Sequence, residues 1–358
     1  MSVWLVNGKI DFLSLSEAEL TTLCEKKGWP AFRARQLVKR QNRFPQSFDE
    51  FSELPKELRA VLDKEYAIPT LTMARKQKSK DGTVKYLFTL WDGQQVESVF
   101  MRYRHGNSLC ISTQVGCRMG CAFCASGLDG LVRNLAPSEM LLQAVMAGRD
   151  TGLRVDSIVM MGTGEPLDNF DASVRFVKMA GREDGLSIGQ RSISLSTSGL
   201  CDKIAKLSEY NLGITLSISL HSPFDEVRSK LMPVNRRWSV GEVVDAATKY
   251  QQKTKRRISY EYAMIDRMTD RPEDAFALAA LLKGKGAHLN LIRLNKIAES
   301  PLKPSAPERE EAFVRQLNEL GLHVTVRRSL GRDIDGACGQ LRRRNRKASE
   351  TNNWGSVE

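Results

Sequence analysis

The sequence predicts an α/β protein, with a parallel sheet or partial barrel as its core and a smaller helical module before it. Its 358 residues exceed one ordinary domain of about 100–200 residues, so two parts are expected. Apolar runs of strand length recur after residue 103 and alternate with helical stretches, which is typical of a parallel sheet. A helical pattern precedes them, between Leu15 and Leu62.

Residues 1–82 are expected to form the accessory domain. Ser16 begins one helix, Pro30 lies near the first turn of another, and two or three short helices fit this stretch. The second helix is strongly basic, which makes it a candidate phosphate-facing surface, although a solvated helix face explains the same pattern and is the favoured interpretation. The basic residues are Arg33, Arg35, Lys39, Arg40 and Arg43.

A β-hairpin is predicted over residues 83–102 and links the accessory domain to the core. Apolar residues alternate on both sides of Asp92-Gly93, a dipeptide that favours a tight turn. The core follows over residues 103–334, and residues 335–358 form a C-terminal segment with a basic tail from Arg342 to Lys347. The six strands predicted in the core are Leu109–Thr113, Ser157–Met161, Ser192–Leu195, Ile214–Ser219, Ile258–Met264 and His288–Leu294, and a seventh apolar run begins at His323.

Charge and composition favour a folded protein with a polyanionic partner. Lys and Arg number 54 against 42 Asp and Glu, a net charge of +12 that makes nucleic acid the first expectation. We predict neither a signal peptide nor a membrane span, because no apolar run is long and uncharged enough. Three of the seven cysteines crowd together, unlike a secreted disulfide framework, so the reducing cytoplasm is the expected compartment.

The crowded cysteines are Cys117, Cys121 and Cys124, in a loop after the first core strand. A structural zinc site needs a fourth ligand, but the next Cys and His are Cys201 and His221, so zinc is the weaker alternative. An iron–sulfur cluster with one open iron fits better. This spacing is the signature of the radical S-adenosylmethionine (SAM) superfamily and predicts a radical SAM partial (β/α)6 barrel with a [4Fe-4S] cluster and SAM.

Polar groups recur where the predicted strands end, at the edge of the sheet that carries the cysteine loop. Gly164 and Glu165 follow the second strand, Ser196 ends the third, His221 follows the fourth and Asn295 follows the sixth. Each alone is an ordinary turn residue. Together they supply hydroxyl, carboxylate, imidazole and amide groups for a bound nucleoside.

Taken together, the motifs resemble one family almost from end to end: the radical SAM adenine methyltransferases of large-subunit ribosomal RNA. That family includes a dual-specificity enzyme acting on adenine C2 of rRNA and tRNA, and a resistance-conferring relative acting on C8. The matching segments are Pro30–Gln36, Val96–Val99, Cys110–Cys124, Met161–Pro166, Leu195–Gly199, Ser219–His221, Asn290–Asn295 and Asp333–Leu341. The last is the most specific, since the cysteine loop alone identifies only the superfamily.

The resemblance assigns roles to individual residues. It implies that Cys338 carries the methyl group, Cys110 is its redox partner, Glu97 is a proton acceptor and Met161 lies near the reacting centre. The implied cofactor-binding residues are Gly164, Glu165, Ser196, Ser219, Leu220, His221 and Asn295. It further implies two SAM molecules per turnover, 23S rRNA and tRNA as substrates, an electron donor such as flavodoxin, and a monomer. The departures from the family pattern are Thr163, Gly336, Ser126 and Lys296.

The chemistry of adenine explains the need for a carrier cysteine. C2 and C8 are sp² carbons without a nucleophilic lone pair, whereas a thiolate accepts a methyl group readily. The resemblance implies methylation of Cys338, radical attack of the methylene carbon on the base, and release when Cys110 attacks the sulfur of Cys338. We favour C2 over C8, which the sequence does not decide. Two further alternatives stay open, a different substrate and a non-catalytic iron–sulfur RNA-binding redox sensor.

Overall fold

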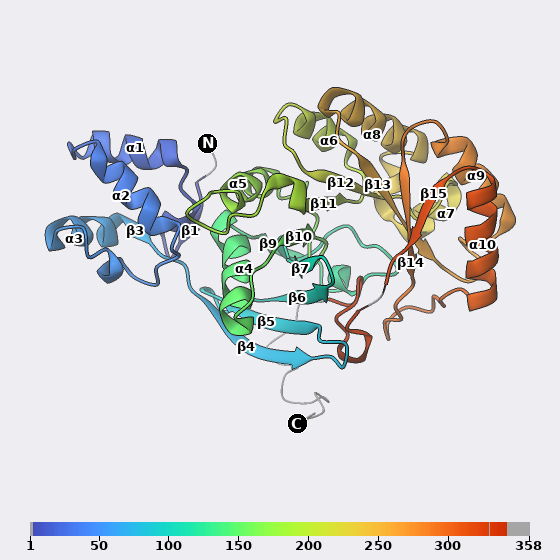
Figure 1. Ribbon diagram of the computed structural model, residues 1–358, viewed down its shortest axis with the longest axis horizontal. Helices are drawn as coiled ribbons and strands as arrows, with labels where there is room; N and C mark the ends of the chain where they lie inside the picture. Colours follow the sequence, from blue (N-terminus) through green and yellow to red (C-terminus); the bar gives the residue numbers. More distant parts are fainter. Residues whose placement is uncertain (1–2, 329, 342–358) are drawn as a thin grey trace.

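The computed structural model describes residues 3–328 and 330–341, and its centre is one ten-stranded sheet. The predicted basic tail, from Arg342 to Lys347, lies outside the described residues. The sheet runs in the order β15-β14-β13-β12-β11-β10-β7-β6-β5-β4, so β15 and β4 are its edges and the barrel stays open. Figure 1 shows the accessory module on one side of this barrel.

Seven strands form the parallel part of the sheet, which confirms the predicted core. They are β7 (Gly106–Cys110), β10 (Ser157–Met160), β11 (Ile193–Thr197), β12 (Thr215–Ser219), β13 (Ile258–Met264), β14 (His288–Arg293) and β15 (His323–Val326). The helices between them are α4 (Pro137–Thr151), α5 (Phe170–Ala180), α6 (Cys201–Ser208), α7 (Asp225–Leu231), α8 (Val240–Thr254), α9 (Pro272–Leu282) and α10 (Pro307–Glu319). All seven residues of β13 are buried, as expected for a strand covered on both faces.

The first core strand was predicted three residues too late. β7 ends at Cys110, because Ile111 and Thr113 bond to the turn after β10: the Gly162 N–H donates to the Ile111 carbonyl, and the Thr113 N–H donates to the Thr163 carbonyl. A short antiparallel pair that the sequence analysis missed follows, β8 (Gln114–Gly116) with β9 (Leu131–Asn134).

The predicted hairpin exists, but it is not a separate link. β5 (Val84–Leu90) and β6 (Gln95–Tyr103) pair across the Asp92-Gly93 turn, where Gly93 has a φ of +79°. β6 also pairs with β7, and β4 (Leu71–Lys78) extends the hairpin on its other side. β4 was missed because it is an edge strand whose sequence, LTMARKQK, is mostly polar.

The accessory module contains the predicted helices, α1 (Glu17–Lys26), α2 (Phe32–Gln41) and α3 (Lys56–Glu65). A small sheet of β1 (Leu5–Val6), β2 (Lys9–Asp11) and β3 (Tyr66–Ala67) was too short to be predicted. The basic face of α2 divides in two. Arg33 donates to the Glu53 carbonyl and Arg40 forms an ion pair with the Glu53 carboxylate, so these two hold the module together, while the others are exposed.

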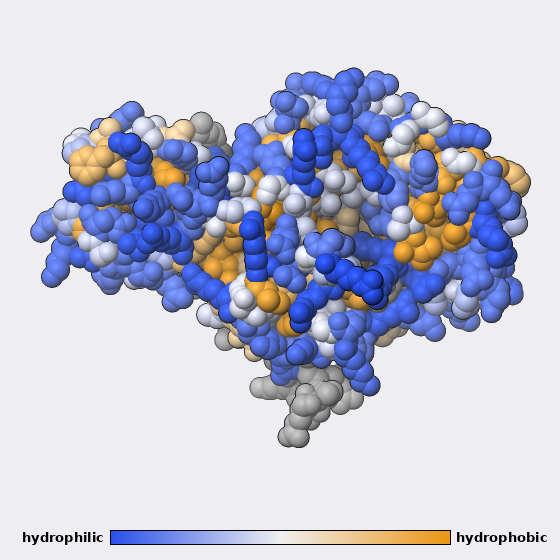
Figure 2. Space-filling model, in the orientation of Figure 1, coloured by the Kyte–Doolittle hydropathy of each residue, from blue (hydrophilic) through white to orange (hydrophobic). Residues whose placement is uncertain are grey.

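Buried polar contacts join this module to the barrel. The Asp11 carboxylate accepts hydrogen bonds from Ser14 and from Ser138 in the first turn of α4, and Arg175 of α5 pairs with Glu19. Within the described residues, none of the helices has the length and apolar character needed to cross a bilayer. The face seen in Figure 2 is largely hydrophilic.

Candidate active site

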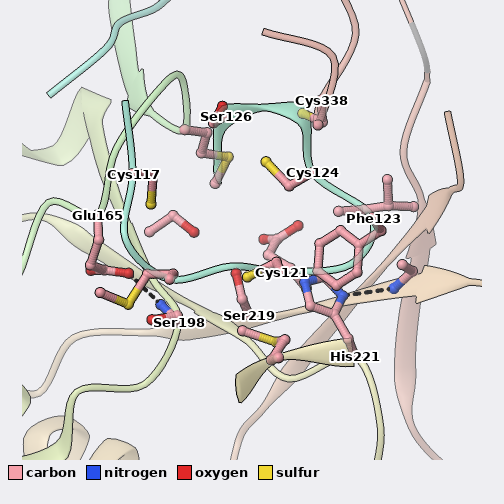
Figure 3. A pocket seen from close by; sticks show the side chains of 18 of the residues that line it. Cys117, Cys121, Phe123, Cys124, Ser126, Glu165, Ser198, Ser219, His221 and Cys338 are labelled. Atoms are coloured by element: carbon pink, nitrogen blue, oxygen red, sulfur yellow. Dashed lines mark hydrogen bonds between the residues drawn. The ribbon is translucent and has the colours of Figure 1, made fainter. Parts of the chain in front are cut away.

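A pocket of about 160 Å³ lies at the carboxyl ends of β10 to β14, between the cysteine loop and the loop that carries Cys338. This is the edge where parallel α/β sheets bind ligands. Figure 3 shows Cys117, Cys121 and Cys124 around the same space, with Cys338 next to Cys124. The sequence-predicted residues that line this pocket are Cys117, Cys121, Cys124, Met161, Gly164, Glu165, Ser196, Ser219, His221, Asn295 and Cys338.

The three loop cysteines suit a cluster rather than a single ion. Among the described residues, no group of three or more His, Cys, Asp or Glu side chains could hold one metal ion. In a cubane each cysteine binds a different iron, so three separated thiols around one pocket are the arrangement required. Burial raises the pKa of the Cys117 thiol to about 12 and that of Cys121 well above its usual value, so bound iron must supply the charge that ionises them.

The turn before Cys117 depends on a glycine. Gly116 has a φ of +76°, and a Cβ there would lie 1.9 Å from the carbonyl oxygen of Gly130. The Cys117 N–H donates to that same carbonyl at 3.0 Å. Only glycine therefore allows the chain to pass this close to β9 as it enters the cysteine loop.

Glu165 is held rigidly at the pocket wall. Its carboxylate accepts a hydrogen bond from the Ser198 N–H at 2.7 Å (Figure 3). A second bond comes from the Leu167 N–H at 3.0 Å. Burial raises the pKa of this carboxyl, and the two backbone donors oppose that shift. The preceding Gly164 has a φ of +113°, and a Cβ there would lie 2.7 Å from Gln114, so the close approach of this turn to β8 explains the glycine.

His221 is a neutral hydrogen-bonding group. Its Nδ1 accepts from the Ala263 N–H at 3.0 Å, which leaves Nε2 as the protonated nitrogen. The ring meets Phe123 of the cysteine loop edge-on, with centroids 4.6 Å apart. Burial lowers the pKa of His221 to about 3, helped by the nearby Arg228. The imidazole is therefore uncharged at neutral pH, and its Nε2–H is a donor for a bound molecule.

Sequence reasoning missed Arg228, a fully buried residue of α7. Its guanidinium donates to the carbonyls of Leu220, Ser198 and Ser219 and to the side chain of Asn235. Arg228 thereby ties the end of β12 to the turn after β11. Burial lowers the pKa of Arg228 to about 10. No pattern in the sequence of α7 distinguishes it from a solvated arginine.

A second, smaller chamber of about 30 Å³ adjoins the pocket and brings Cys110 and Cys338 together. Met161, Asn295 and Arg327 line both spaces. Burial raises the pKa of the Cys110 thiol to about 12; the neighbouring Cys338 adds to the shift and Arg327 opposes it. Arg327, directly after β15, was also missed; it is the first of two consecutive arginines, and its position after an apolar run was a usable signal.

Two predicted residues lie outside both spaces. Leu220 is fully buried, and its carbonyl accepts from Arg228. Glu97 is fully buried in β6 and pairs with Lys85 of β5 at 3.0 Å. Glu97 is two residues from Val99, which is the strand partner of Cys110, so it lies beside the chamber without lining it. Another missed residue, Glu261 of β13, lines the pocket as a buried carboxylate within a fully buried strand.

Comparison with known proteins identifies the family. The model of the radical SAM superfamily matches residues 111–279. A protein of Lachnoclostridium phytofermentans named "Probable dual-specificity RNA methyltransferase RlmN" is 46% identical over 94% of this chain and 96% of its own length. The chain belongs to the RlmN family of radical SAM methyltransferases. An RlmN relative from Halalkalibacterium halodurans is also 46% identical, over 93% of each chain.

A solved structure agrees with this membership. The crystal structure of a radical SAM methyltransferase from Sphaerobacter thermophilus superimposes with a TM-score of 0.86, at 41% identity, over 92% of this chain and 98% of its own. The radical SAM fold predicted for the core is therefore confirmed.

Proposed function

We propose that the protein methylates C2 of an adenine in 23S rRNA and in tRNA, with Cys338 as the methyl carrier. The observation that carries this proposal is the shared chamber of Cys110 and Cys338, which opens beside the pocket of the three loop cysteines. A superfamily member that only cleaved SAM would need the pocket but not the second cysteine pair. The names of the RlmN relatives support RNA as the substrate.

The residues present fit the cluster and SAM. Cys117, Cys121 and Cys124 would hold the cluster, and Glu165, with the hydroxyl and amide groups around it, would bind the amino acid and nucleoside parts of SAM. The bound pair supplies one-electron chemistry, which removes hydrogen from carbon that polar reactions leave inert. Since one SAM donates the methyl group and another serves the cluster, we propose two per turnover.

The cysteine pair performs two opposite tasks in this proposal. Cys338 accepts a methyl group as a thiolate and loses its proton. After the base adduct has lost an electron and a proton, the Cys110 thiolate attacks the sulfur of Cys338. The bond between that sulfur and the base-bound carbon breaks, the carbon keeps the electron pair and takes up a proton to become the methyl group, and a disulfide remains. Two electrons from a donor such as flavodoxin restore both thiols. Glu97 is the proposed proton acceptor, and Met161 lies between the two spaces beside the reacting atoms.

Three alternatives are separated by measurement. Mass spectrometry of nucleosides from rRNA and tRNA, in cells with and without the gene, should show 2-methyladenosine only where the gene is present. Finding 8-methyladenosine would assign the protein to the C8 chemistry instead. A redox sensor would leave all nucleosides unchanged and would show no methyl mass on Cys338. We further propose that the protein is a monomer and that it acts in the cytoplasm, where both RNAs are found.

A further inference from the structure

The loop of residues 331–341, which carries Cys338, is held by the distant end of the β4–β5 hairpin. The Asp333 carboxylate accepts hydrogen bonds from the Ser79 hydroxyl at 2.6 Å and the Lys80 N–H at 3.2 Å. In return, the Gly331 N–H donates to the Asp81 carboxylate at 2.9 Å. Figure 1 shows this loop beside the end of the hairpin. The turn at residues 79–83 and the loop thus hold one another through side chains on both partners.

Lys85 adds a buried contact to the same loop. Its side chain is 2% exposed, and its ammonium donates to the Asp335 carbonyl at 3.0 Å while it pairs with the fully buried Glu97 at 3.0 Å. Lys85 lies opposite Val99 in the sheet, and Val99 lies opposite Cys110, so the three share one row across β5, β6 and β7. The ammonium therefore joins the strands beneath the chamber to the loop above it.

Burying a lysine ammonium costs free energy unless its N–H groups donate hydrogen bonds. A stability role alone would be met by an apolar residue, as at the neighbouring buried positions of β5. Here the ammonium binds both a carboxylate of the sheet and a carbonyl of the loop. An apolar side chain would make neither contact. Past Cys338, the Ala125 N–H donates to the Gly339 carbonyl at 2.8 Å and the Ser126 hydroxyl to the Leu341 carbonyl at 2.6 Å. The loop is therefore fixed on both sides of the cysteine.

We propose that the 79–83 turn and Lys85 form an anchor that positions Cys338 over Cys110, with Lys85 as a positioning residue that couples the loop to Glu97. This inference rests on the proposed function, because it gives the loop its purpose. It assigns the hairpin a part in the reaction, where the sequence suggested only a link between domains.

Hydrogen–deuterium exchange of the holoenzyme tests the anchor. In Lys85→Met, and independently in Asp333→Ala, exchange of residues 331–341 should rise by about tenfold or more, since each variant removes charge-assisted hydrogen bonds. Exchange in β13 should not change. Asp333 is exposed, so its variant stays folded even if Lys85→Met does not. Lys76→Met is the matched control, because Lys76 lies on the same hairpin but pairs with Asp150, away from the loop.

Unchanged exchange of the loop in Asp333→Ala and in folded Lys85→Met would overturn the proposal, and so would an equal rise in Lys76→Met. The fraction of methylated Cys338 in protein taken from cells provides the second readout. It should fall in both anchor variants while their affinity for RNA is retained. If wild-type Cys338 carries no methyl group but the loop still loosens as described, the anchor stands and the proposed function fails.

Discussion

The two spaces of the site are built in different ways. The larger pocket, about 160 Å³, is assembled from the ends of consecutive strands, with Glu165 after β10, Ser196 in β11 and Ser219 in β12. The smaller chamber, about 30 Å³, lies between β6, β7, the end of β14, the residues that follow β15 and the 331–341 loop. It has room for about two water molecules. The larger space has room for a cofactor, whereas the cysteine pair lies in a tight space where a methyl group fits.

The largest expected effect comes from removing a cluster ligand, which affects the larger pocket and not the chamber. Cys121→Ala should abolish cluster assembly, from about four irons per chain to almost none, because two thiolates hold a cubane poorly. Iron analysis after anaerobic reconstitution and RNA methylation measure the effect. Cys201→Ser is the control, since Cys201 is a partly buried cysteine that lines neither space. Normal SAM cleavage by Cys121→Ala would refute the assigned ligand set.

Arg228→Met sharpens the comparison because it affects the pocket alone. Removing the buried guanidinium takes one donor away from each of three carbonyls, and it should lower the free energy of unfolding by about 2–4 kcal/mol. SAM affinity should fall with it. Denaturant titration and equilibrium dialysis measure both, with Arg237→Met as a control, because Arg237 is exposed and stacks on Trp238. Equal stability of the two variants would show that Arg228 does not organise the pocket.

The accessory module offers a smaller effect on binding. Arg35 and Lys39 are exposed, so their joint reversal to Glu should weaken RNA binding about tenfold at low salt and reduce its salt dependence. Arg40→Glu instead breaks the ion pair with Glu53 and should destabilise the module. Filter binding over a salt series distinguishes them. Unchanged affinity in the double variant would mean that this face is only solvated.

The last expected effect is a pH dependence of the free energy of unfolding, and it comes from His221 in the pocket. The pKa of His221 is lowered to about 3 in the folded protein, so the unfolded chain binds a proton that the folded chain rejects between about pH 6.5 and pH 3. The stability that neutral His221 contributes is complete above about pH 6.5 and is lost at about 1.4 kcal/mol per unit as pH falls. His221→Gln should flatten the curve of unfolding free energy against pH between 4 and 6. An identical slope in both proteins would contradict the buried, neutral imidazole.

The same contrast explains how much could be predicted. The pocket residues were accessible from sequence because Gly164, Glu165, Ser196 and Asn295 each follow a strand whose apolar run is visible, and parallel strands share one edge. The roles of Cys338 and Cys110 came from resemblance alone. Nothing in their spacing places them together, since the chamber forms only where β6 and β7 meet the residues that follow β15 in the folded chain.

The contacts that could not be predicted from the sequence join residues that are far apart along the chain. Lys85 looked like one polar residue of a hairpin, and only the packed sheet shows it buried beneath the 331–341 loop. Arg33 and Arg40 were candidate RNA contacts, but both bind Glu53 of the same module. The extra strand β4 escaped because an edge strand needs no apolar face on its solvent side. Local pattern predicts elements well, but it does not identify which charged groups pair across the fold.

The central claim is that Cys338 carries the methyl group and Cys110 releases the product. Cys110→Ala should leave methylation of Cys338 and attack on the base intact but block release, so an RNA-linked protein should accumulate. The measurement is mass spectrometry of the variant purified from cells and digested with ribonuclease, with Cys201→Ala treated alike. A peptide containing Cys338 bonded to an adenine nucleotide is the predicted result. A Cys110→Ala protein that is free of RNA and fully active would contradict the account.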